Sequence, residues 1–264
     1  MLQLNNIFKV FNEGTLDEKI ALNHLNLHLE DGDFVTVIGS NGAGKSTVMN
    51  MISGGLLPDL GSVVIDGKDV TNLPEFKRSK YIGRVFQDPM AGTAPTMTIE
   101  ENLAIAYGRV NRRGLRFGVS KKRLDLFKSA LETLNLGLEN RLNAKVGLLS
   151  GGERQALSLL MATFTNPRIL LLDEHTAALD PSRAELITNL TKEIVEKSKL
   201  TTLMVTHNMQ QAIELGNRLI MMDKGQIIFE ASGNEKEQLT VEILLQKFQE
   251  IRGEQMASDR AVLG

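Results

Sequence analysis

The sequence contains no cysteine in its 264 residues. Disulfide bonds and thiolate metal sites are therefore excluded, and an oxidising compartment receives no support. The chain also has no apolar run near the roughly 18 residues that a membrane-spanning helix needs. Its first 30 residues are polar and acidic and lack the apolar core of a signal peptide. We therefore expect a cytoplasmic protein that lies peripherally at the membrane only through a partner.

A strong excess of charge is missing too. The formal net charge is −2, so bulk electrostatics gives no reason to expect a nucleic-acid partner. The sequence has neither a coiled-coil heptad run nor an internal repeat. What remains is a globular composition, with 42% hydrophobic and 23% charged residues. The length suits one large domain or a domain with a subdomain.

The pattern of apolar residues predicts an α/β protein. A continuously apolar segment such as "DFVTVIGS" is typical of a buried parallel strand, whereas "IALNHLNLHLE" partly alternates, like a half-buried antiparallel strand. A run of helical patterns predicts an α-helical subdomain, at about 90–165, inserted into the α/β core. We expect strands at 2–11, 20–30, 33–40, 81–88, 168–174 and 201–207, hairpins at 62–70 and 217–230, and helices at 45–53, 98–109, 120–136, 151–165, 181–198 and 238–252.

Two dipeptides are expected to form the hairpin turns. They are Asp66-Gly67 and Lys224-Gly225, each lying between two β-like segments. The tail after Gly253 is expected to be loose.

The segment "GSNGAGKST" matches the P-loop pattern, and it follows a buried strand and opens a helix, as the pattern requires. Its glycines let backbone N–H groups approach phosphate oxygens, and the helix N-terminus adds partial positive charge. Lys45 can reach the β- and γ-phosphates, and the Ser46 hydroxyl can bind Mg²⁺. The alternative is an ordinary glycine-rich turn, which the Lys, the Ser and the flanking elements together disfavour. The residues expected at the nucleotide are Gly39, Ser40, Asn41, Gly42, Ala43, Gly44, Lys45, Ser46 and Thr47.

An acidic pair, Asp173 and Glu174, ends the apolar strand "ILLLDE". Ligands of open parallel sheets bind beyond the carboxyl ends of the strands. Because the P-loop follows another such strand, we expect the two strand ends to lie side by side. Asp173 would then hold Mg²⁺ and Glu174 would polarise an attacking water. The alternative is that the pair caps the next helix.

A second phosphate-binding pattern occurs in "LLSGGERQ". Ser150, Gly151 and Gly152 lie directly before a predicted helix, and a hydroxyl with two glycines at a helix N-terminus suits a phosphate group. One nucleotide-binding domain has no evident need for two such sites.

These motifs resemble the ATP-binding-cassette (ABC) ATPases over roughly residues 2–231. They occur in the order of that family: the P-loop, "VFQD", "LSGGERQ", the acidic strand end, "AALD" and "VTHN". The resemblance implies a P-loop NTPase core with an N-terminal antiparallel β subdomain and an inserted α-helical subdomain. It divides the chain into an ABC ATPase domain, 1–231, and a C-terminal helix with a loose tail, 232–264.

The resemblance also implies roles for single residues. Gln87 would contact Mg²⁺ or the attacking water, although it could be a surface residue. His207 would contact the γ-phosphate, although a His at a strand end is often structural. Asp180 would organise a dimer interface, a role compatible with capping the helix that follows. Phe11 would stack on adenine, although Phe8 lies close by and a Phe in a strand is usually in the core.

Family members form head-to-tail dimers, and this would explain the second phosphate-binding pattern. Ser150, Gly151 and Gly152 would bind the γ-phosphate of ATP held by the partner's P-loop. Two ATP molecules, with Mg²⁺, would thus lie between the two chains of a homodimer. One departure is His175, which follows Glu174 where many members have Pro. Other members also carry His there, so the departure does not indicate lost activity.

A single cassette without membrane helices resembles the ATPase subunit of a bacterial transporter, which acts on a separate membrane permease. It is most similar to importer ATPases partnered with branched-chain-amino-acid-type permeases, some of them linked to tryptophan or other aromatic amino acids. A substrate-binding protein would then be an indirect partner. The alternatives are an ATP-dependent clamp on nucleic acid or ribosomes and a non-hydrolysing regulatory subunit. Intact Lys45, Asp173, Glu174 and His207 argue against the regulatory subunit.

The segment that follows Gln87 resembles the region that docks onto a permease. A basic stretch comes next, with seven Lys or Arg residues and no acid from Arg109 to Arg123. It is either a solvated loop or a contact for the permease or for anionic lipid headgroups.

Overall fold

The computed structural model describes residues 1–109 and 121–250. The expected loose tail after Gly253 lies outside the described residues, as does most of the basic stretch between Arg109 and Arg123. Within the described ranges, no helix is long and apolar enough to cross a membrane.

The centre of the molecule is a six-stranded sheet in the order β10-β9-β3-β8-β7-β6. Its strands pair in parallel except for the hairpin of β9 and β10. Alternate residues of β3 face opposite sides: Val35 and Val37 pack with the core on one side, and Phe34 with the core on the other. The strands are β3 (Phe34–Gly39), β6 (Ile82–Val85), β7 (Ile169–Asp173), β8 (Thr201–Val205), β9 (Arg218–Asp223) and β10 (Gln226–Ser232).

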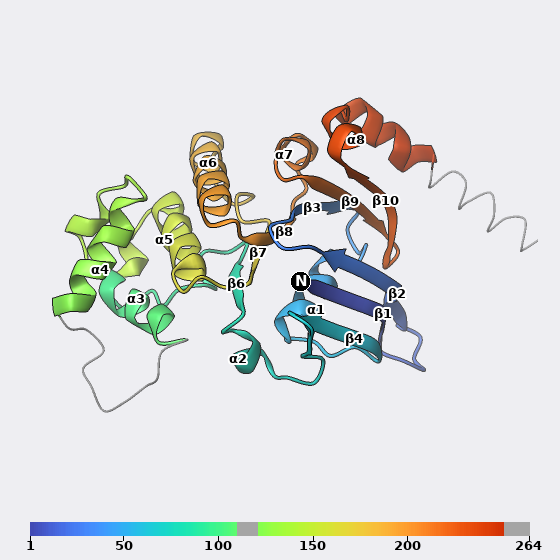
Figure 1. The fold of residues 1–264 in the computed structure, drawn as a ribbon, viewed down its shortest axis with the longest axis horizontal. Helices are drawn as coiled ribbons and strands as arrows, with labels where there is room; N and C mark the ends of the chain where they lie inside the picture. Colours follow the sequence, from blue (N-terminus) through green and yellow to red (C-terminus); the bar gives the residue numbers. More distant parts are fainter. Residues whose placement is uncertain (110–120, 251–264) are drawn as a thin grey trace, which may run out of the picture.

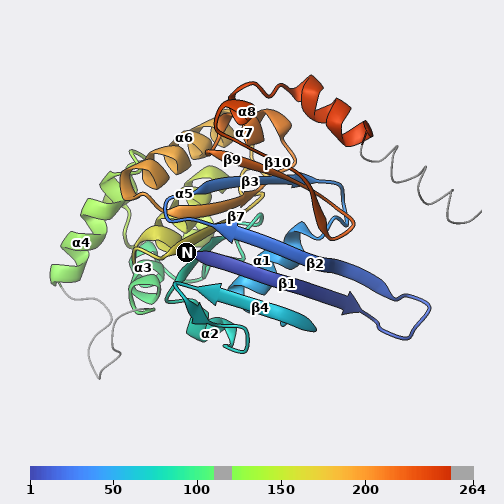
Figure 2. The same cartoon turned by 45° about the vertical axis from the view of Figure 1, so that its right-hand side comes forward.

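A second, antiparallel sheet has the order β2-β1-β4-β5. Helix α1 (Lys45–Ser53) lies between the two sheets (Figures 1 and 2), and its buried residues join one apolar core with residues of both. The positive φ angles of Asp66 and Gly67 fit the predicted hairpin turn. The strands are β1 (Leu2–Phe11), β2 (Lys19–Leu29), β4 (Leu60–Ile65) and β5 (Lys68–Asp69).

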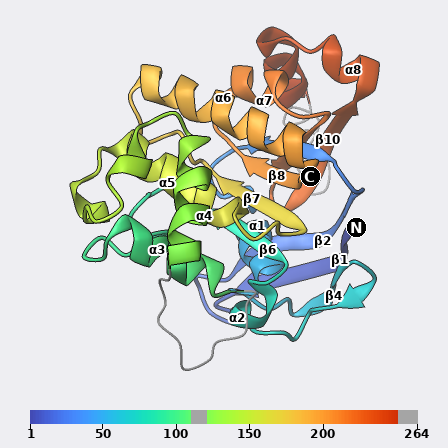
Figure 3. The ribbon, with the colours of Figure 1, turned by 60° about the vertical axis from the view of Figure 1, so that its left-hand side comes forward.

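Helices cover the other face of the central sheet. A second apolar core joins residues of β6, β7 and β8 to helices α3, α4, α5 and α6. Helices α3, α4 and α5 cluster to one side of the sheets, as Figures 1 and 3 show. The short helix α2 (Glu75–Arg78) precedes β6. The larger elements are α3 (Ile99–Tyr107), α4 (Lys121–Glu132), α5 (Gly151–Thr163) and α6 (Pro181–Ser198), with 3-10 turns η1 (Leu138–Asn140) and η2 (Val146–Leu148).

The predicted helix over 238–252 is confirmed over residues 241–250, three residues later than its predicted start, and its last two residues lie outside the described range. The predicted hairpin is formed by β9 and β10. Two short helices before residue 238 were not predicted: α7 (Met209–Glu214) and α8 (Gly233–Glu237). Lys236 fixes α8 against α7, because its buried ammonium donates hydrogen bonds to the carbonyls of Ile213, Leu215 and Gly216 at the end of α7. The predicted strand at 81–88 is also shorter, ending at Val85.

Candidate nucleotide site and its surroundings

The loop between β3 and α1 accepts only glycine at its two ends. Gly39 has φ 154° and Gly44 has φ 101°, which favour glycine. A Cβ on Gly39 would lie 2.2 Å from the Met222 carbonyl oxygen, and a Cβ on Gly44 would lie 2.6 Å from that of Ala21. Gly44 is the N-cap residue of α1 and gives its first N–H groups no side-chain acceptor. The loop therefore leaves backbone donors at a helix N-terminus for an anion.

Lys45 begins α1, and its side chain folds back over this loop. Nζ donates hydrogen bonds to the carbonyl oxygens of Gly39, at 2.8 Å, and Ser40, at 3.0 Å. Burial lowers the pKa of Lys45, while the nearby carboxylates of Glu174 and Asp173 act in the opposite direction. The ammonium is thus held above the loop, close to two carboxylates, where a phosphate would complete its partners.

A cavity of about 190 Å³ lies over the loop and brings together residues from distant parts of the chain. Of the residues that the sequence predicts for the site, Phe11, the loop and α1 residues 41–47, Glu174 and His207 line it. Lys19 and Ala21 of β2 complete the lining.

Glu174 and His207 lie opposite each other at this cavity. Glu174 Oε1 is 2.6 Å from His207 Nε2, and the Glu174 side chain is only 14% exposed. Glu174 has a left-handed backbone, with φ 48°, and its N–H donates to the Val205 carbonyl of β8 at 2.9 Å. The turn after β7 is therefore bonded to β8, and the Glu174 carboxylate points toward His207, two residues after that strand ends.

Asp173 lies beside the cavity rather than in its lining. The strand ends of β3 and β7 do not lie side by side, because β8 pairs between them. Asp173 does not line the cavity; Arg84 Nη2 instead donates to its Oδ2 at 3.0 Å. The expectation that the two strand ends lie side by side is therefore wrong. Asp173 is still close enough for its charge to act on Lys45, and its role as a metal ligand stays a prediction. The pair does not cap α6, whose N-cap residue is Asp180.

Gln87 lies just after β6 and is exposed, outside the lining of the cavity. Its loop is anchored by Gln155 of α5, a residue that the sequence reasoning missed. Gln155 Nε2 donates to the carbonyl of Phe86 at 3.1 Å and to that of His175 at 2.7 Å. One buried amide thus joins the segment before Gln87 to the segment after Glu174.

The segment Ser150, Gly151 and Gly152 starts α5 and does not line the cavity. Ser150 and Glu153 form a capping box, in which the Ser150 hydroxyl accepts from the Glu153 N–H at 3.3 Å and Glu153 Oε2 accepts from the Ser150 N–H at 2.7 Å. Leu148, just before, is 76% exposed. Asp180 caps α6 in a similar way by accepting from the Arg183 N–H at 3.2 Å. Within one chain, the second phosphate-binding pattern is therefore separate from the first.

Lys19 is a second residue that the sequence reasoning missed. It pairs with Phe11 across β1 and β2, and its Nζ would be 3.3 Å from a Cβ on Gly42. Lys19 adds a second cation to the cavity. The register of β1 and β2 could have revealed it, but irregularities at three points of this pairing hide that register from a sequence pattern.

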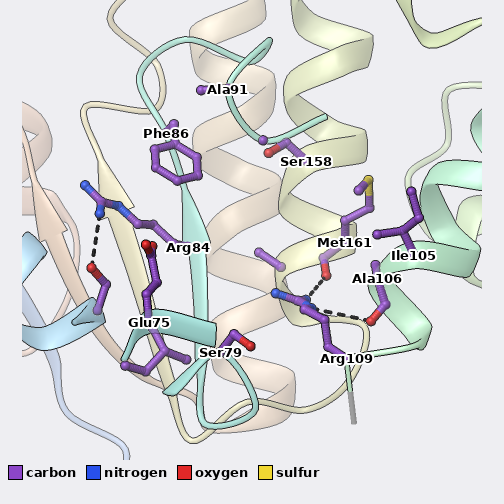
Figure 4. A pocket seen from close by; sticks show the side chains of 14 residues that line it. Glu75, Ser79, Arg84, Phe86, Ala91, Ile105, Ala106, Arg109, Ser158 and Met161 are labelled. Carbon is purple, nitrogen blue, oxygen red and sulfur yellow. Dashed lines mark hydrogen bonds between the residues drawn. The ribbon is translucent and has the colours of Figure 1, made fainter. Parts of the chain in front are cut away.

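A groove of about 250 Å³ lies beside β6 and shares no lining residue with the cavity over the P-loop. Figure 4 shows this groove. It is bordered by α2, by the segment after Gln87 and by α3 and α5. Arg109, the one described residue of the basic stretch at this groove, donates to the carbonyls of Met161 and Ala106. Burial lowers its pKa. Other lining residues are Glu75, Ser79, Ile82, Arg84, Phe86, Ile105 and Ser158.

The residues around the cavity suit a magnesium ion bound mainly by its nucleotide. In the described part of the chain, no group of three or more His, Cys, Asp or Glu side chains could hold a metal. Mg²⁺ characteristically takes only one or two protein oxygens and completes its shell with phosphates and waters. The Ser46 hydroxyl at the cavity and the Asp173 carboxylate beside it are hard oxygen donors of this kind.

Comparisons with known proteins agree with this geometry. The family model described as "ABC transporter" matches residues 22–177. A tyrosine transport ATP-binding protein of Clostridioides difficile is 45% identical over 94% of this chain and 99% of its own length. The xylose/arabinose import ATP-binding protein XylG of Sulfolobus acidocaldarius is 35% identical, over 84% of this chain and 85% of its own. A dimeric, post-hydrolysis structure of the ATP-binding cassette MJ0796 with ADP and Pi has a TM-score of 0.75 and 31% identity, and the match covers 88% of this chain and 98% of that one.

Proposed function

This chain belongs to the ABC transporter family and is an ATP-hydrolysing subunit; from that premise we propose that it drives an amino-acid importer through a separate membrane permease. The cargo class that we propose is an aromatic amino acid. The observation that carries this proposal is the 45% identity, over nearly the full length of both chains, to a protein named for tyrosine transport. Because none of the site residues would touch the cargo, its identity rests on this relationship.

The proposed site residues divide the chemical work. The N–H groups after Gly44, with Lys45 and Lys19, bind the phosphates, and Phe11 stacks on adenine. The Glu174 carboxylate orients and polarises the attacking water, and His207, 2.6 Å away, holds that carboxylate and faces the γ-phosphate. Ser46 and Asp173 would hold Mg²⁺, with Gln87 as a third candidate contact, and the ion would supply positive charge against the transferred phosphate.

The active unit that we propose is a head-to-tail homodimer. Ser150, Gly151 and Gly152 of one chain would close over ATP held by the loop 39–47 of the other. The separation of the two motifs within one chain supports this arrangement, since neither can complete the other locally. The related cassette MJ0796 has a dimeric structure with ADP and Pi. Asp180, which caps α6, would lie at the interface.

The proposed route from the nucleotide to the permease passes through Gln87 and the helices inserted at about 90–165. Gln155 supports this route, because it bonds both the segment before Gln87 and the segment after Glu174. The ABC ATPase domain would span 1–231 and the C-terminal part 232–264. The protein would work at the cytoplasmic side of the membrane, peripherally, with a substrate-binding protein as an indirect partner.

Transport measurements test this proposal. Cells that lack the gene should lose uptake of labelled tyrosine, tryptophan or phenylalanine, and the wild-type chain, but not Glu174→Gln, should restore it. Unchanged uptake of all three amino acids would refute the aromatic cargo. Gentle purification separates the alternative function: a transporter subunit should bring down a polytopic membrane protein, whereas a clamp should bring down nucleic acid or ribosomes.

A further inference from the structure

Arg84 lies in the middle of β6 and joins three elements of the nucleotide-binding core. Its Nη2 donates to Asp173 Oδ2 of β7 at 3.0 Å. Its Nη1 donates to Asn50 Oδ1 at 2.8 Å and to Ser53 Oγ at 3.3 Å, both on α1. Its guanidinium carbon lies 4.7 Å from the centre of the Phe86 ring. The helix that follows the P-loop and the strand that carries Asp173 are therefore connected by one side chain.

Burial makes this connection strong. The side chains of Arg84 and Asp173 are only 14% and 17% exposed, so solvent and salt screen their attraction much less than at the surface. In the described part of the chain, Arg84 Nε is buried without a hydrogen-bond partner. Such an unsatisfied donor costs free energy. An apolar side chain at this position of β6 would avoid the cost of the unsatisfied Nε donor, yet the chain has an arginine there.

The bond also leaves the carboxylate usable. It engages Oδ2 and takes no part in the contacts of Oδ1, so Asp173 can still offer an oxygen to a metal or to a metal-bound water. A guanidinium that bonds one oxygen fixes the rotation of the carboxylate and hence the direction of the other. Carboxylates that bind metals are characteristically oriented by such outer partners. Figure 4 shows that Arg84 also forms part of the groove beside β6.

We propose that Arg84 is a positioning residue for the magnesium-dependent reaction: by holding Oδ2 it sets the direction in which Asp173 meets the metal. The inference rests on the proposed metal role of Asp173 and extends it to a residue outside the motifs. Arg84 touches neither nucleotide nor metal in this proposal and acts through Asp173.

The test is the magnesium dependence of ATP binding by the full-length chain. A fluorescent ATP analogue is titrated first in EDTA and then, at fixed nucleotide, with Mg²⁺. Arg84→Met should bind the analogue like the wild type in EDTA, but should need about tenfold more Mg²⁺ to reach half of the magnesium-dependent change. Arg84→Lys should recover part of the loss, because lysine keeps the charge but lacks the fork that bonds Asp173 and Asn50 together.

Two further variants make the result specific. Arg168→Met removes another Arg–Asp pair, in which Arg168 Nε lies 2.9 Å from Asp66 Oδ2 and the Arg168 side chain is 64% exposed. This variant should leave the magnesium dependence unchanged. An unaltered magnesium dependence in Arg84→Met, or an equal loss in EDTA, would overturn the inference. If Asp173→Asn also leaves the dependence unaltered, then the proposed metal role of Asp173 is wrong as well. If Asp173→Asn alters it and Arg84→Met does not, only the inference about Arg84 fails.

Discussion

Glu174 Oε1 lies 2.6 Å from His207 Nε2, across the turns that follow β7 and β8. The two strands are neighbours in the sheet. A carboxylate and an imidazole that are 33 positions apart in the chain therefore meet beyond the carboxyl ends of these strands. The positive φ of Glu174 turns the carboxylate away from the strand and toward the histidine. This contact places the proposed base and the residue proposed to orient it at the same cavity as the P-loop.

Glu174→Gln tests the base. The amide keeps the shape of the side chain but cannot accept a proton, so we expect ATP binding to remain and hydrolysis to fall by about 10²–10⁴-fold. The measurement is phosphate release, with size-exclusion chromatography in ATP, where the proposed dimer should accumulate. The exposed Glu185 of α6 provides the matched control Glu185→Gln. Near-normal hydrolysis in Glu174→Gln would remove Glu174 from this role.

Ser150→Arg tests the proposed two-chain site. The larger side chain should block closure of the dimer and hydrolysis, while the single chain keeps its affinity for ATP through residues 39–47. The assay is nucleotide binding at low protein concentration, followed by dimer detection in ATP. Loss of binding by the single chain would contradict the arrangement.

A pair of alanine variants separates capping from nucleotide contact at the same position. Thr98 caps α3 with the same capping box that Ser150 forms at α5. Thr98→Ala and Ser150→Ala should each lower the free energy of unfolding by about 1 kcal/mol. Only Ser150→Ala should also weaken the dimer; equal effects on the dimer would show that helix capping alone accounts for Ser150.

Phe11→Ala tests the adenine contact. Stacking of a base on an aromatic ring is worth about 1–3 kcal/mol, so the ATP affinity should fall by roughly 5- to 150-fold. Phe8→Ala is the natural control, because Phe8 packs against His24 with ring centres 5.3 Å apart and does not line the cavity. A larger loss of ATP affinity in Phe8→Ala than in Phe11→Ala would assign the adenine contact to Phe8 and contradict the proposal.

His175 makes stability depend on pH. Complete burial lowers its pKa from 6.5 to about 4, and its Nε2 lies 3.0 Å from Thr191 Oγ1. Between pH 6.5 and about pH 4, His175 binds a proton in the unfolded chain but not in the folded chain. The free energy of unfolding should therefore fall as the pH drops from 6.5 toward 4, by roughly 3 kcal/mol from this group.

Urea unfolding at pH 7 and pH 5 measures this effect. His175→Gln, which carries no titrating ring, should lose less stability than the wild type between the two pH values. An equal loss in both proteins would assign the acid sensitivity to other groups.

Most local structure could be predicted from the sequence because its causes are local. Helix α1 begins and ends where predicted, at Lys45 and Ser53, since a left-handed glycine precedes it and another follows it. The predicted turns at Asp66-Gly67 and Lys224-Gly225 are also present, and both residues of each turn have a positive φ. The helix predicted at 238–252 is present over 241–250. The short helix α8 before it was not predicted, because Lys236 contacts carbonyls at the end of α7 that lie at least 20 positions away in the chain.

The sequence by itself determined the family, the phosphate-binding loop and the identity of the acidic pair, because each depends on residue types at short, fixed spacings. Only the tertiary structure decided which side chains meet. The order of the strands put β8 between β3 and β7, the register of β1 and β2 set Lys19 opposite Phe11, and the packing of β6 against α1 and β7 joined Arg84 to Asp173. These contacts bring together residues far apart in the chain, and the burial that makes them strong exists only once the sheets and helices have packed.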